Sequence, residues 1–247
     1  SNARTFPKAN GKLYNSLATD LPLGPLSMSA YLKKHTDVDV RLIDFNVELN
    51  WADDFPFESF YDYSYKFLED YDYQPDIVGV SSLFSPSFVN FMEAAKASKE
   101  IFPNSIIVGG GHIPTNIHDQ IYKEYDCDFF DCLCFGEGEK PMLELILADN
   151  TKKYLEESPC WVTKEKVLSG FTPAHNFIEN LDEIPFYDYD LCDMDRHGLN
   201  PVMSAYATIE NQLGFHIMTS RGCPFFAPFV LHIWSMEEQC DIIVLIV

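Results

Sequence analysis

Hydroxyl-bearing residues and glycines follow three short apolar segments of the sequence. If these segments are parallel strands, the residues meet at the carboxyl edge of one sheet, where open α/β sheets bind ligands. Hydroxyl groups and bare backbone would form a cradle for a large, flat or extended polar ligand, and the helix N-termini beyond them could hold an anion such as a phosphate. The candidate residues are Ser81, Ser82, Leu83 and Ser85, then Gly109, Gly110, Gly111 and His112, and finally Gly136, Glu137 and Gly138.

Each cluster also has a plain structural explanation. A glycine triplet is common in a tight strand-to-helix turn, and a serine pair often caps the next helix. Neither Gly109 nor Gly136 begins a Gly-x-Gly-x-x-Gly run, and both lie late in the predicted sheet. Because the dinucleotide fingerprint follows the first strand of its sheet, the pattern excludes a nicotinamide site of that type.

Strand and helix patterns alternate from residue 76 to residue 150. Short, β-branched and nearly uncharged runs are typical of buried strands, and the longer segments between them have helical composition. This alternation predicts an α/β fold: a Rossmann-like (flavodoxin-like), doubly wound parallel sheet with helices on both faces and an irregular C-terminal extension. The expected strands are 38–45, 76–83, 104–111 and the start of 127–139, and the expected helices are 22–35, one within 48–75, 86–102, 114–125 and 139–150.

The rhythm changes after Asn150. The segment 160–171 suggests a hairpin, and 172–212, which is rich in proline, aspartate and tyrosine, suggests a long ordered linker. One more strand is expected at 214–222. The apolar residues 241–247 would be an aggregation hazard if exposed, so we expect them to pair with a sheet edge or a symmetry mate. The expected divisions are a tag remnant at 1–3, an α/β domain at 4–150, the hairpin and linker at 151–212, and a separate segment at 213–247.

Charge and composition exclude several classes of function. The 247 residues include 17 basic and 38 acidic ones, which gives a net charge of −21 and argues against nucleic-acid binding. The longest terminal apolar run is too short to span a bilayer. No export signal is seen, so the seven cysteines are expected to be reduced thiols in the cytoplasm. The identity of a protein partner cannot be predicted from the sequence, although the acidic balance would suit a basic one.

Taken together, the clusters resemble the cobalamin-binding domain. That family has a Ser-x-Leu motif after one strand and Gly-Gly after the next, and here these match Ser81 with Leu83 and Gly109 with Gly110. The resemblance implies that these residues line a slot for the nucleotide tail of cobalamin and its phosphate. The "GEGE" stretch, the linker "NLDEIPFYDYDL" and the helix "PLGPLSMSAYL" resemble the subgroup fused to a radical S-adenosylmethionine barrel, so residues 213–247 look like the truncated start of that barrel.

Two departures from the family pattern limit this expectation. The sequence has no Asp-x-His-x-x-Gly motif, whose histidine ligates cobalt in many carriers, so cobalamin would bind without a protein imidazole on the metal. His112 and His118 lie near the proposed slot, but a surface or capping role is favoured for a lone histidine.

The second departure concerns the iron–sulfur motif Cys-x-x-x-Cys-x-x-Cys. Cys223 is its remaining candidate ligand, because Ala227 and Val230 stand at the next two positions and cannot bind iron. A 4Fe-4S cluster and S-adenosylmethionine are therefore expected only in a full-length relative and not in this chain. The cysteines within 127–134 are interpreted as small buried hydrophobic residues, with Cys132 and Cys134 on one strand face and Leu133 on the other.

The leading hypothesis is a cobalamin-binding module of a radical S-adenosylmethionine enzyme, whose full-length relative would act as a methyltransferase or carry out a radical rearrangement. For this chain no catalytic residue is assigned, and ligand binding without turnover is expected. The alternative is a non-catalytic interaction or sensory domain that keeps the fold and lacks cobalamin, with the aromatic, acidic stretch 55–73 as its contact surface. A flavin or nucleotide at the same edge is a third possibility, which no phosphate loop on the first strand supports.

Overall fold

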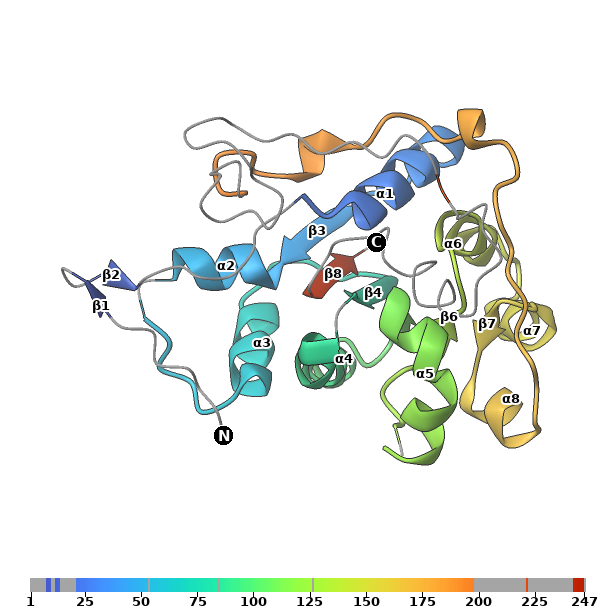
Figure 1. Ribbon diagram of the computed structural model, residues 1–247, viewed down its shortest axis with the longest axis horizontal. Coiled ribbons are helices and arrows are strands. Elements are labelled where there is room, and N and C mark those ends of the chain that lie inside the picture. Colours follow the sequence, from blue (N-terminus) through green and yellow to red (C-terminus); the bar gives the residue numbers. More distant parts are fainter. Residues whose placement is uncertain are drawn as a thin grey trace, which may run out of the picture.

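The computed structural model describes residues 21–52, 54–83, 85–125, 127–197 and 221, together with the backbone of short strands at 8–9, 12–13 and 242–246. A six-stranded sheet in the order β3-β8-β4-β5-β6-β7 forms its centre (Figure 1). The strands β3, β4, β5 and β6 run in one direction, and β8 and β7 run in the opposite one. The predicted α/β fold is confirmed, as a mixed and mostly parallel sheet. The strand bounds are β3 Arg41–Asp44, β4 Ile77–Ser82, β5 Ile106–Gly110, β6 Cys132–Cys134, β7 Trp161–Val162 and β8 Ile242–Ile246, with β1 Lys8–Ala9 and β2 Lys12–Leu13 paired separately.

Helices cover both faces of this sheet (Figure 1). The face that carries α1 and α6 also packs against α7, and the opposite face packs against α3, α4 and α5. Within the described residues, no helix is both long enough and apolar enough to cross a bilayer. The helix bounds are α1 Leu23–His35, α2 Phe45–Trp51, α3 Phe60–Glu69, α4 Phe88–Ile101, α5 His112–Lys123, α6 Glu139–Ile146, α7 Thr151–Glu157 and α8 Lys164–Leu168, with 3₁₀ turns at Ser85–Ser87, Leu181–Glu183 and Tyr189–Leu191.

The central strand β4 is buried on both faces, as its β-branched sequence predicts. Val78 and Val80 belong to the core under α4, whereas Ile77 belongs to the core under α1 and α6. The buried face of α4 carries several alanines, including Ala94 and Ala95, which are fully buried. Short side chains allow the helix axis to approach the sheet closely, and this fixes α4 above the ends of β4 and β5.

The C-terminal strand β8 occupies a position that the sequence did not predict. It lies inside the sheet and pairs antiparallel with β3 on one side and β4 on the other, so that Ile243 lies opposite both Asp44 and Ser81. The expectation of a sheet edge or a symmetry mate is therefore wrong. An interior position satisfies the backbone hydrogen bonds of three strands at once, whereas an edge position would leave one side of β8 unpaired.

Two local predictions also need correction. The aromatic insert contributes the one helix that was predicted there, α3. A second helix, α2, begins at residue 45. The Asp44 side chain caps its start by accepting hydrogen bonds from the backbone N–H groups of Asn46 and Val47. The predicted hairpin at 160–171 is wrong: β7 pairs with β6, and Thr163 then caps α8. Residues 161–162 pair with β6, a strand that is distant in sequence, instead of with a neighbouring strand of a local hairpin.

The segment 171–197 crosses the outside of α1 and ends beside α2 (Figure 1). Asp188 accepts hydrogen bonds from Ser29 and Lys33 of α1, each at 2.6 Å. Arg196 forms a two-pronged ion pair with Glu48 of α2, with both distances 2.8 Å. This part of the predicted linker is ordered by polar contacts, and its predicted remainder, with the expected strand at 214–222, lies outside the described residues apart from Arg221.

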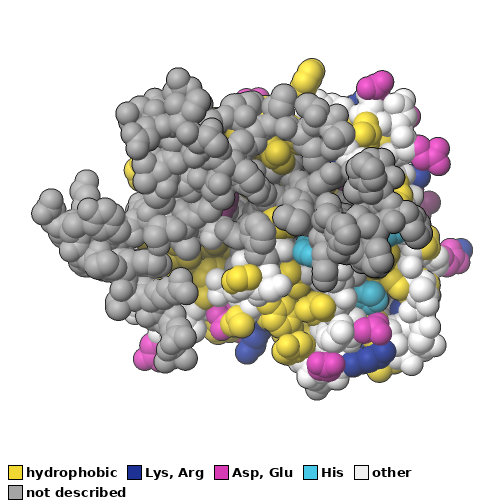
Figure 2. Space-filling model, viewed as in Figure 1, with side chains coloured by type: hydrophobic (Ala, Val, Ile, Leu, Met, Phe, Trp, Pro, Cys, Tyr) yellow, Lys and Arg dark blue, Asp and Glu magenta, His cyan; other side chains and the backbone are white. Residues whose placement is uncertain are grey.

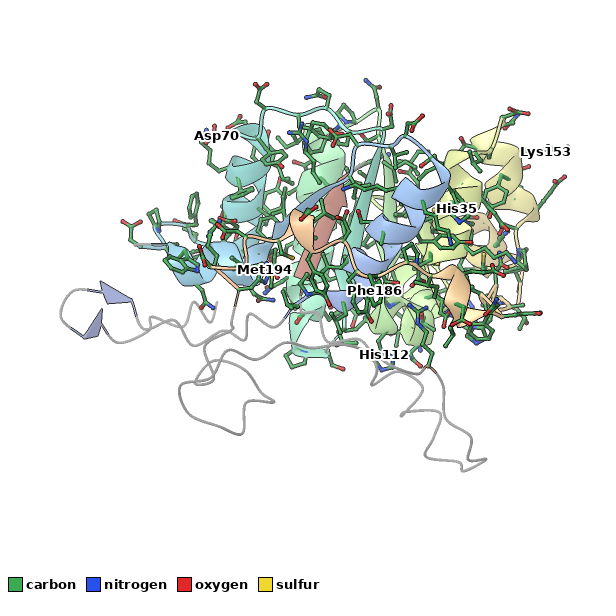
Figure 3. The ribbon with its side chains drawn as sticks, turned by 90° about the horizontal axis from the view of Figure 1, so that it is seen from above. His35, Asp70, His112, Lys153, Phe186 and Met194 are labelled. Carbon is green, nitrogen blue, oxygen red and sulfur yellow. The ribbon has the colours of Figure 1, made fainter. Side chains whose placement is uncertain are left out.

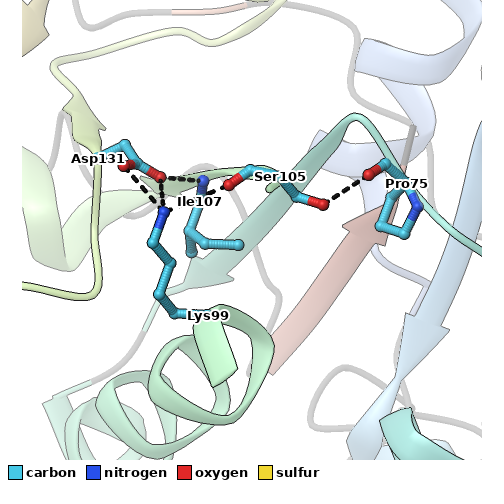
Figure 4. A network of polar contacts seen from close by, with 5 residues as sticks. All are labelled: Pro75, Lys99, Ser105, Ile107 and Asp131. Atoms are coloured by element: carbon cyan, nitrogen blue, oxygen red, sulfur yellow. Dashed lines mark hydrogen bonds and ion pairs between the residues drawn. The ribbon is translucent and has the colours of Figure 1, made fainter. Parts of the chain in front are cut away.

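A polar network holds the amino-terminal ends of β5 and β6 together (Figure 4). Asp131 accepts a hydrogen bond from the Ile107 backbone N–H at 2.7 Å and pairs with Lys99 of α4 at 2.9 Å. The Ser105 hydroxyl donates to the Pro75 carbonyl at 2.6 Å. These contacts hold the start of β5 in place relative to its neighbours. The length of the strand then determines the position of its carboxyl end.

We predict that Asp131→Ala lowers the free energy of unfolding by about 1–3 kcal/mol, because the part-buried Ile107 N–H group loses its side-chain acceptor and Lys99 loses its carboxylate partner. Urea unfolding followed by circular dichroism measures this change. The matched control is Asp128→Ala, which removes the ion pair of an exposed carboxylate with Lys164 and should cost less than about 1 kcal/mol. Equal losses in the two variants would contradict the role of the network.

Candidate functional site

The carboxyl ends of β4 and β5 bring the serine and glycine clusters together. Ser81 lies opposite Gly110 in the register of the two strands. Gly111 follows with a φ angle of +93°, and a Cβ atom there would lie 2.6 Å from the Ser82 carbonyl oxygen and 3.0 Å from the Ser81 Oγ. Only glycine allows this approach. The expectation that these two clusters are neighbours is confirmed.

Gly109 and Gly110 face opposite sides of the sheet and meet different surroundings. A Cβ atom on Gly109 would lie 2.5 Å from the Leu133 side chain and 3.0 Å from Phe91, so the core needs a glycine there. Among the described residues, no heavy atom would lie within 4 Å of a Cβ atom on Gly110. Gly110 and Ser81 face the same side as Val108 and Ile77, which is the side covered by α1 and α6. The described residues therefore leave space at the end of the strands on that side.

The two serines at the end of β4 differ in their environment. The Ser82 side chain is fully buried, and its hydroxyl has no hydrogen-bond partner among the described residues. A buried hydroxyl without a partner costs about 1–3 kcal/mol and calls for an explanation such as a bound ligand. Leu83 is buried as well, whereas Ser85 is exposed in the 3₁₀ turn that precedes α4.

Thr115 of α5 links the second glycine turn to the third. Its hydroxyl donates to the Gly111 carbonyl at 2.9 Å and accepts a hydrogen bond from the Gly136 backbone N–H at 3.1 Å. Gly136 has a φ angle of +89°, and the imidazole ring of His175 occupies the place that a Cβ atom would take. All three predicted turns are thus connected. The sequence analysis missed Thr115, although its spacing of four residues from Gly111 on a helix was visible.

His175 was also missed, because it lies far along the chain in a segment without periodic pattern. Its ring packs between Phe135, at a centroid distance of 4.5 Å, and Phe177, at 4.6 Å. Burial lowers the pKa of His175, so its ring is neutral at neutral pH. It closes the outer side of the Gly136 turn.

His112 and His118 occupy the first half of α5, near the three turns. Figure 3 shows His112 at the rim of the molecule, and Asn116 lies 2.6 Å from its Nδ1. The His118 Nδ1 lies 3.2 Å from the Thr115 carbonyl, and its ring meets Phe135 edge-on. In Figure 2 histidine side chains reach the surface among hydrophobic ones on the side of α4 and α5, where Val89 and Tyr125 are exposed. Local contacts orient both imidazoles.

A cluster of charged groups surrounds the start of α6. Glu139, the first residue of the helix, is buried and receives hydrogen bonds from Ser27 of α1 at 2.7 Å and from Arg221 at 2.5 Å. Arg221 also pairs with Glu137 at 3.3 Å. Desolvation raises the pKa of Glu137, although Arg221 opposes that effect. Glu137, which the sequence predicts as a cofactor-binding residue, therefore forms an ion pair with an arginine that is distant in sequence.

The cysteines follow the predicted alternation. Cys132 and Cys134 lie in the core under α1 and α6, while Leu133 lies in the core under α4 and α5. Burial raises the pKa of the Cys132 thiol well above its ordinary value, which disfavours the thiolate that metals require. Among the described residues, no group of three potential ligands is placed to hold a metal ion. Cys223 lies outside the described residues.

We predict that the neighbouring glycines Gly109 and Gly110 respond differently to the same substitution. Gly109→Ala should lower the free energy of unfolding by about 1–3 kcal/mol, because the added methyl group overpacks the core against Leu133. Gly110→Ala should change it by less than about 1 kcal/mol, because the methyl group enters open space. Urea midpoints of the two variants give the comparison. A larger loss for Gly110→Ala would show that the side facing α1 and α6 is filled.

Comparisons with known proteins agree with this arrangement. A model of the B12 binding domain family matches residues 18–146, which is more than half of the chain. An uncharacterized methyltransferase of Pyrococcus horikoshii is 30% identical over 211 residues, and an anaerobic magnesium-protoporphyrin IX monomethyl ester cyclase of Rubrivivax gelatinosus is 29% identical over 162 residues. These alignments cover 85% and 63% of this chain but only 40% and 27% of the two relatives. No solved structure matches.

The matched region contains α1, β3 to β6 and all three connected turns. Its boundaries therefore coincide with the elements that build the candidate site, and the identity with the first relative extends over most of the remaining chain. The chain belongs to the B12-binding domain family.

Proposed function

We propose that this chain binds cobalamin at the carboxyl edge of β4, β5 and β6. We propose further that it serves as the cobalamin-binding module of a radical S-adenosylmethionine enzyme that transfers methyl groups or carries out a radical rearrangement. Family membership supports the ligand, and the Pyrococcus relative, an uncharacterized methyltransferase, supports the reaction class.

The observation that carries the proposal is the space beside Gly110 that the described residues leave unfilled. It lies on the side of the sheet covered by α1 and α6, beside Ser81 in the neighbouring strand. A hydroxyl and a bare backbone segment next to unfilled space suit the extended nucleotide tail of cobalamin, which needs both a polar anchor and room along the main chain.

Two further features suit the phosphate of that tail. α5 begins at Gly111 without a side-chain cap, so its first backbone N–H groups and its dipole favour an anion. Ser82 lies next to Gly111 through its carbonyl, and its buried hydroxyl, on the side of β4 that faces α4 and α5, can donate to a ligand oxygen. A phosphate oxygen would thus satisfy a group that the described protein residues leave without a partner.

Bound cobalamin would supply a cobalt centre able to carry a methyl group. The residues of this chain hold and orient the cofactor, and His112 and His118 take part in local contacts rather than in a carrier-type histidine motif. The residues available for a cluster do not fit one, because Ala227 and Val230 cannot ligate iron. No step of catalysis is therefore assigned to this chain.

The packing of the aromatic segment 55–73 argues against the alternative function, a non-catalytic interaction domain. Phe60 and Phe67 of α3 pack edge-on against the buried Phe45, with ring centroids 5.3 and 5.5 Å apart. Several tyrosines of the same helix also lie against the core. These rings hold α3 on the domain, and a contact surface would instead present them to solvent.

We predict that the purified chain retains hydroxocobalamin through desalting and that Gly110→Trp abolishes this retention, because an indole would fill the open space. Visible absorbance of the desalted protein gives the measurement. Val89→Trp adds the same side chain to an exposed position of α4 and should retain the cofactor like the wild type. Circular dichroism confirms that both variants are folded. Retention by Gly110→Trp would place the ligand elsewhere, and no retention by the wild type would refute cobalamin binding.

A second prediction separates stability from binding. Ser82→Ala should leave the unfolding free energy of the cofactor-free chain unchanged or raise it by about 1 kcal/mol, because it removes a buried hydroxyl without a partner. The same change should weaken cobalamin binding about tenfold, since one hydrogen bond to a charged phosphate is lost. Thermal unfolding and equilibrium titration measure the two effects. A destabilised variant with unchanged affinity would contradict the assignment.

A further inference from the structure

Arg221 connects three parts of the chain that are far apart in sequence. One of its terminal nitrogens lies 2.5 Å from Glu139 of α6 and 3.0 Å from the Ser27 hydroxyl of α1, and the other lies 3.3 Å from Glu137. Ser27 itself donates to Glu139 at 2.7 Å. The four residues, which we call the carboxylate clasp, close the gap between α1 and the start of α6.

The two carboxylates of the clasp require a cation beside them, and Arg221 supplies it. The Glu139 side chain is only 3% exposed, and Glu137 lies two residues before it, so two carboxylates share a poorly solvated place in a chain of net charge −21. Among the described residues, Arg221 is the cation that forms ion pairs with both. Removing one partner of a buried pair is strongly unfavourable, because the remaining charge is left without compensation.

The clasp lies next to the proposed cobalamin edge. Glu139 follows Gly138, whose backbone is so close to α1 that a Cβ atom would lie 2.6 Å from the Met28 methyl group. On the other side of the same turn, Gly136 is bound to Thr115, which is bound to Gly111. The positions of α1 and α6 also define the covered side on which Gly110 has open space.

We propose that Arg221 is a positioning residue: by closing the carboxylate clasp it holds the turn 135–139 and the pair α1 and α6 in the geometry that accepts cobalamin. This inference rests on the proposed function. Because Arg221 precedes Cys223 by two residues in the sequence, the clasp would tie the cofactor edge directly to the segment that carries that cysteine. The ion pairs of Arg221 with the two glutamates and occupancy of the cobalamin slot would then favour each other.

The first experiment tests the clasp without any cofactor. Amide hydrogen exchange of peptides that cover residues 135–139 is compared in the wild type, Arg221→Ala and Arg41→Ala. Arg41 is an exposed arginine paired with an exposed aspartate, and it serves as the matched control. We expect exchange in the turn to be at least about tenfold faster in Arg221→Ala and unchanged in Arg41→Ala. Unchanged protection in Arg221→Ala would overturn the clasp.

The second experiment tests the link to binding by equilibrium titration with hydroxocobalamin. Arg221→Ala should raise the dissociation constant about tenfold or more, Arg221→Lys should raise it less, and Arg41→Ala should leave it unchanged. A turn that exchanges faster while the affinity stays the same would overturn the coupling. If the wild type binds no cobalamin, the proposed function fails, and the exchange result still decides whether the clasp exists.

A double-mutant cycle distinguishes a charge-specific role from general loss of packing. In Glu139→Gln the amide can still accept the hydrogen bond from Ser27, and the more deeply buried carboxylate of the clasp loses its charge while Glu137 keeps its own. Arg221→Ala in this background should therefore change the exchange rate and the affinity by clearly less than about tenfold. A full tenfold effect in the Glu139→Gln background would show that Arg221 acts through bulk alone and would overturn the proposal.

Discussion

The parallel register of β4 against β5 is the constraint on which the candidate site depends. It places Ser81 opposite Gly110, after which the chain leaves β5 at Gly111 and leaves β4 after Ser82. Gly111 can pass the end of β4 only because it lacks a side chain, since a Cβ atom would collide with the Ser82 carbonyl oxygen. At the opposite end of the sheet, the Ser105 hydroxyl donates to the Pro75 carbonyl and joins the starts of β4 and β5, while Asp131 accepts from the Ile107 N–H and joins β5 to the start of β6.

Exposed and buried carboxylates of this protein differ in how their charges are stabilised. The large excess of acidic residues lies mostly where water can solvate it, and the buried carboxylates are the exceptions. Asp44 caps α2 with its side chain, and Glu139 is bound by Ser27 and Arg221. Each buried carboxylate therefore has donors that stand in for water, as burial of a charge requires. Where those donors come from distant segments, the charge also joins those segments together.

The predicted strands and helices between residues 22 and 146 were found with small shifts at their ends, because apolar periodicity and turn residues act locally. The prediction of a hairpin at 160–171 was wrong for the opposite reason. β7 pairs with β6, and no local sequence pattern reveals this pairing. The three turns of the site could be predicted from their serines and glycines. Thr115, His175 and Arg221 could not, because each matters through a contact with a residue that the chain brings near only after folding.

The sequence by itself determined the class of fold, the family and the residues at the ends of the strands, since composition and spacing along a strand decide which side chains can face a sheet edge. Only the tertiary structure decided that Gly109 packs in the core while Gly110 faces space that the described residues leave unfilled, because the two sides of a strand are distinguished by what packs on them. It also placed β8 between β3 and β4 and brought Arg221 to Glu139. Pairing between distant segments depends on the whole folded chain, and no local pattern encodes it.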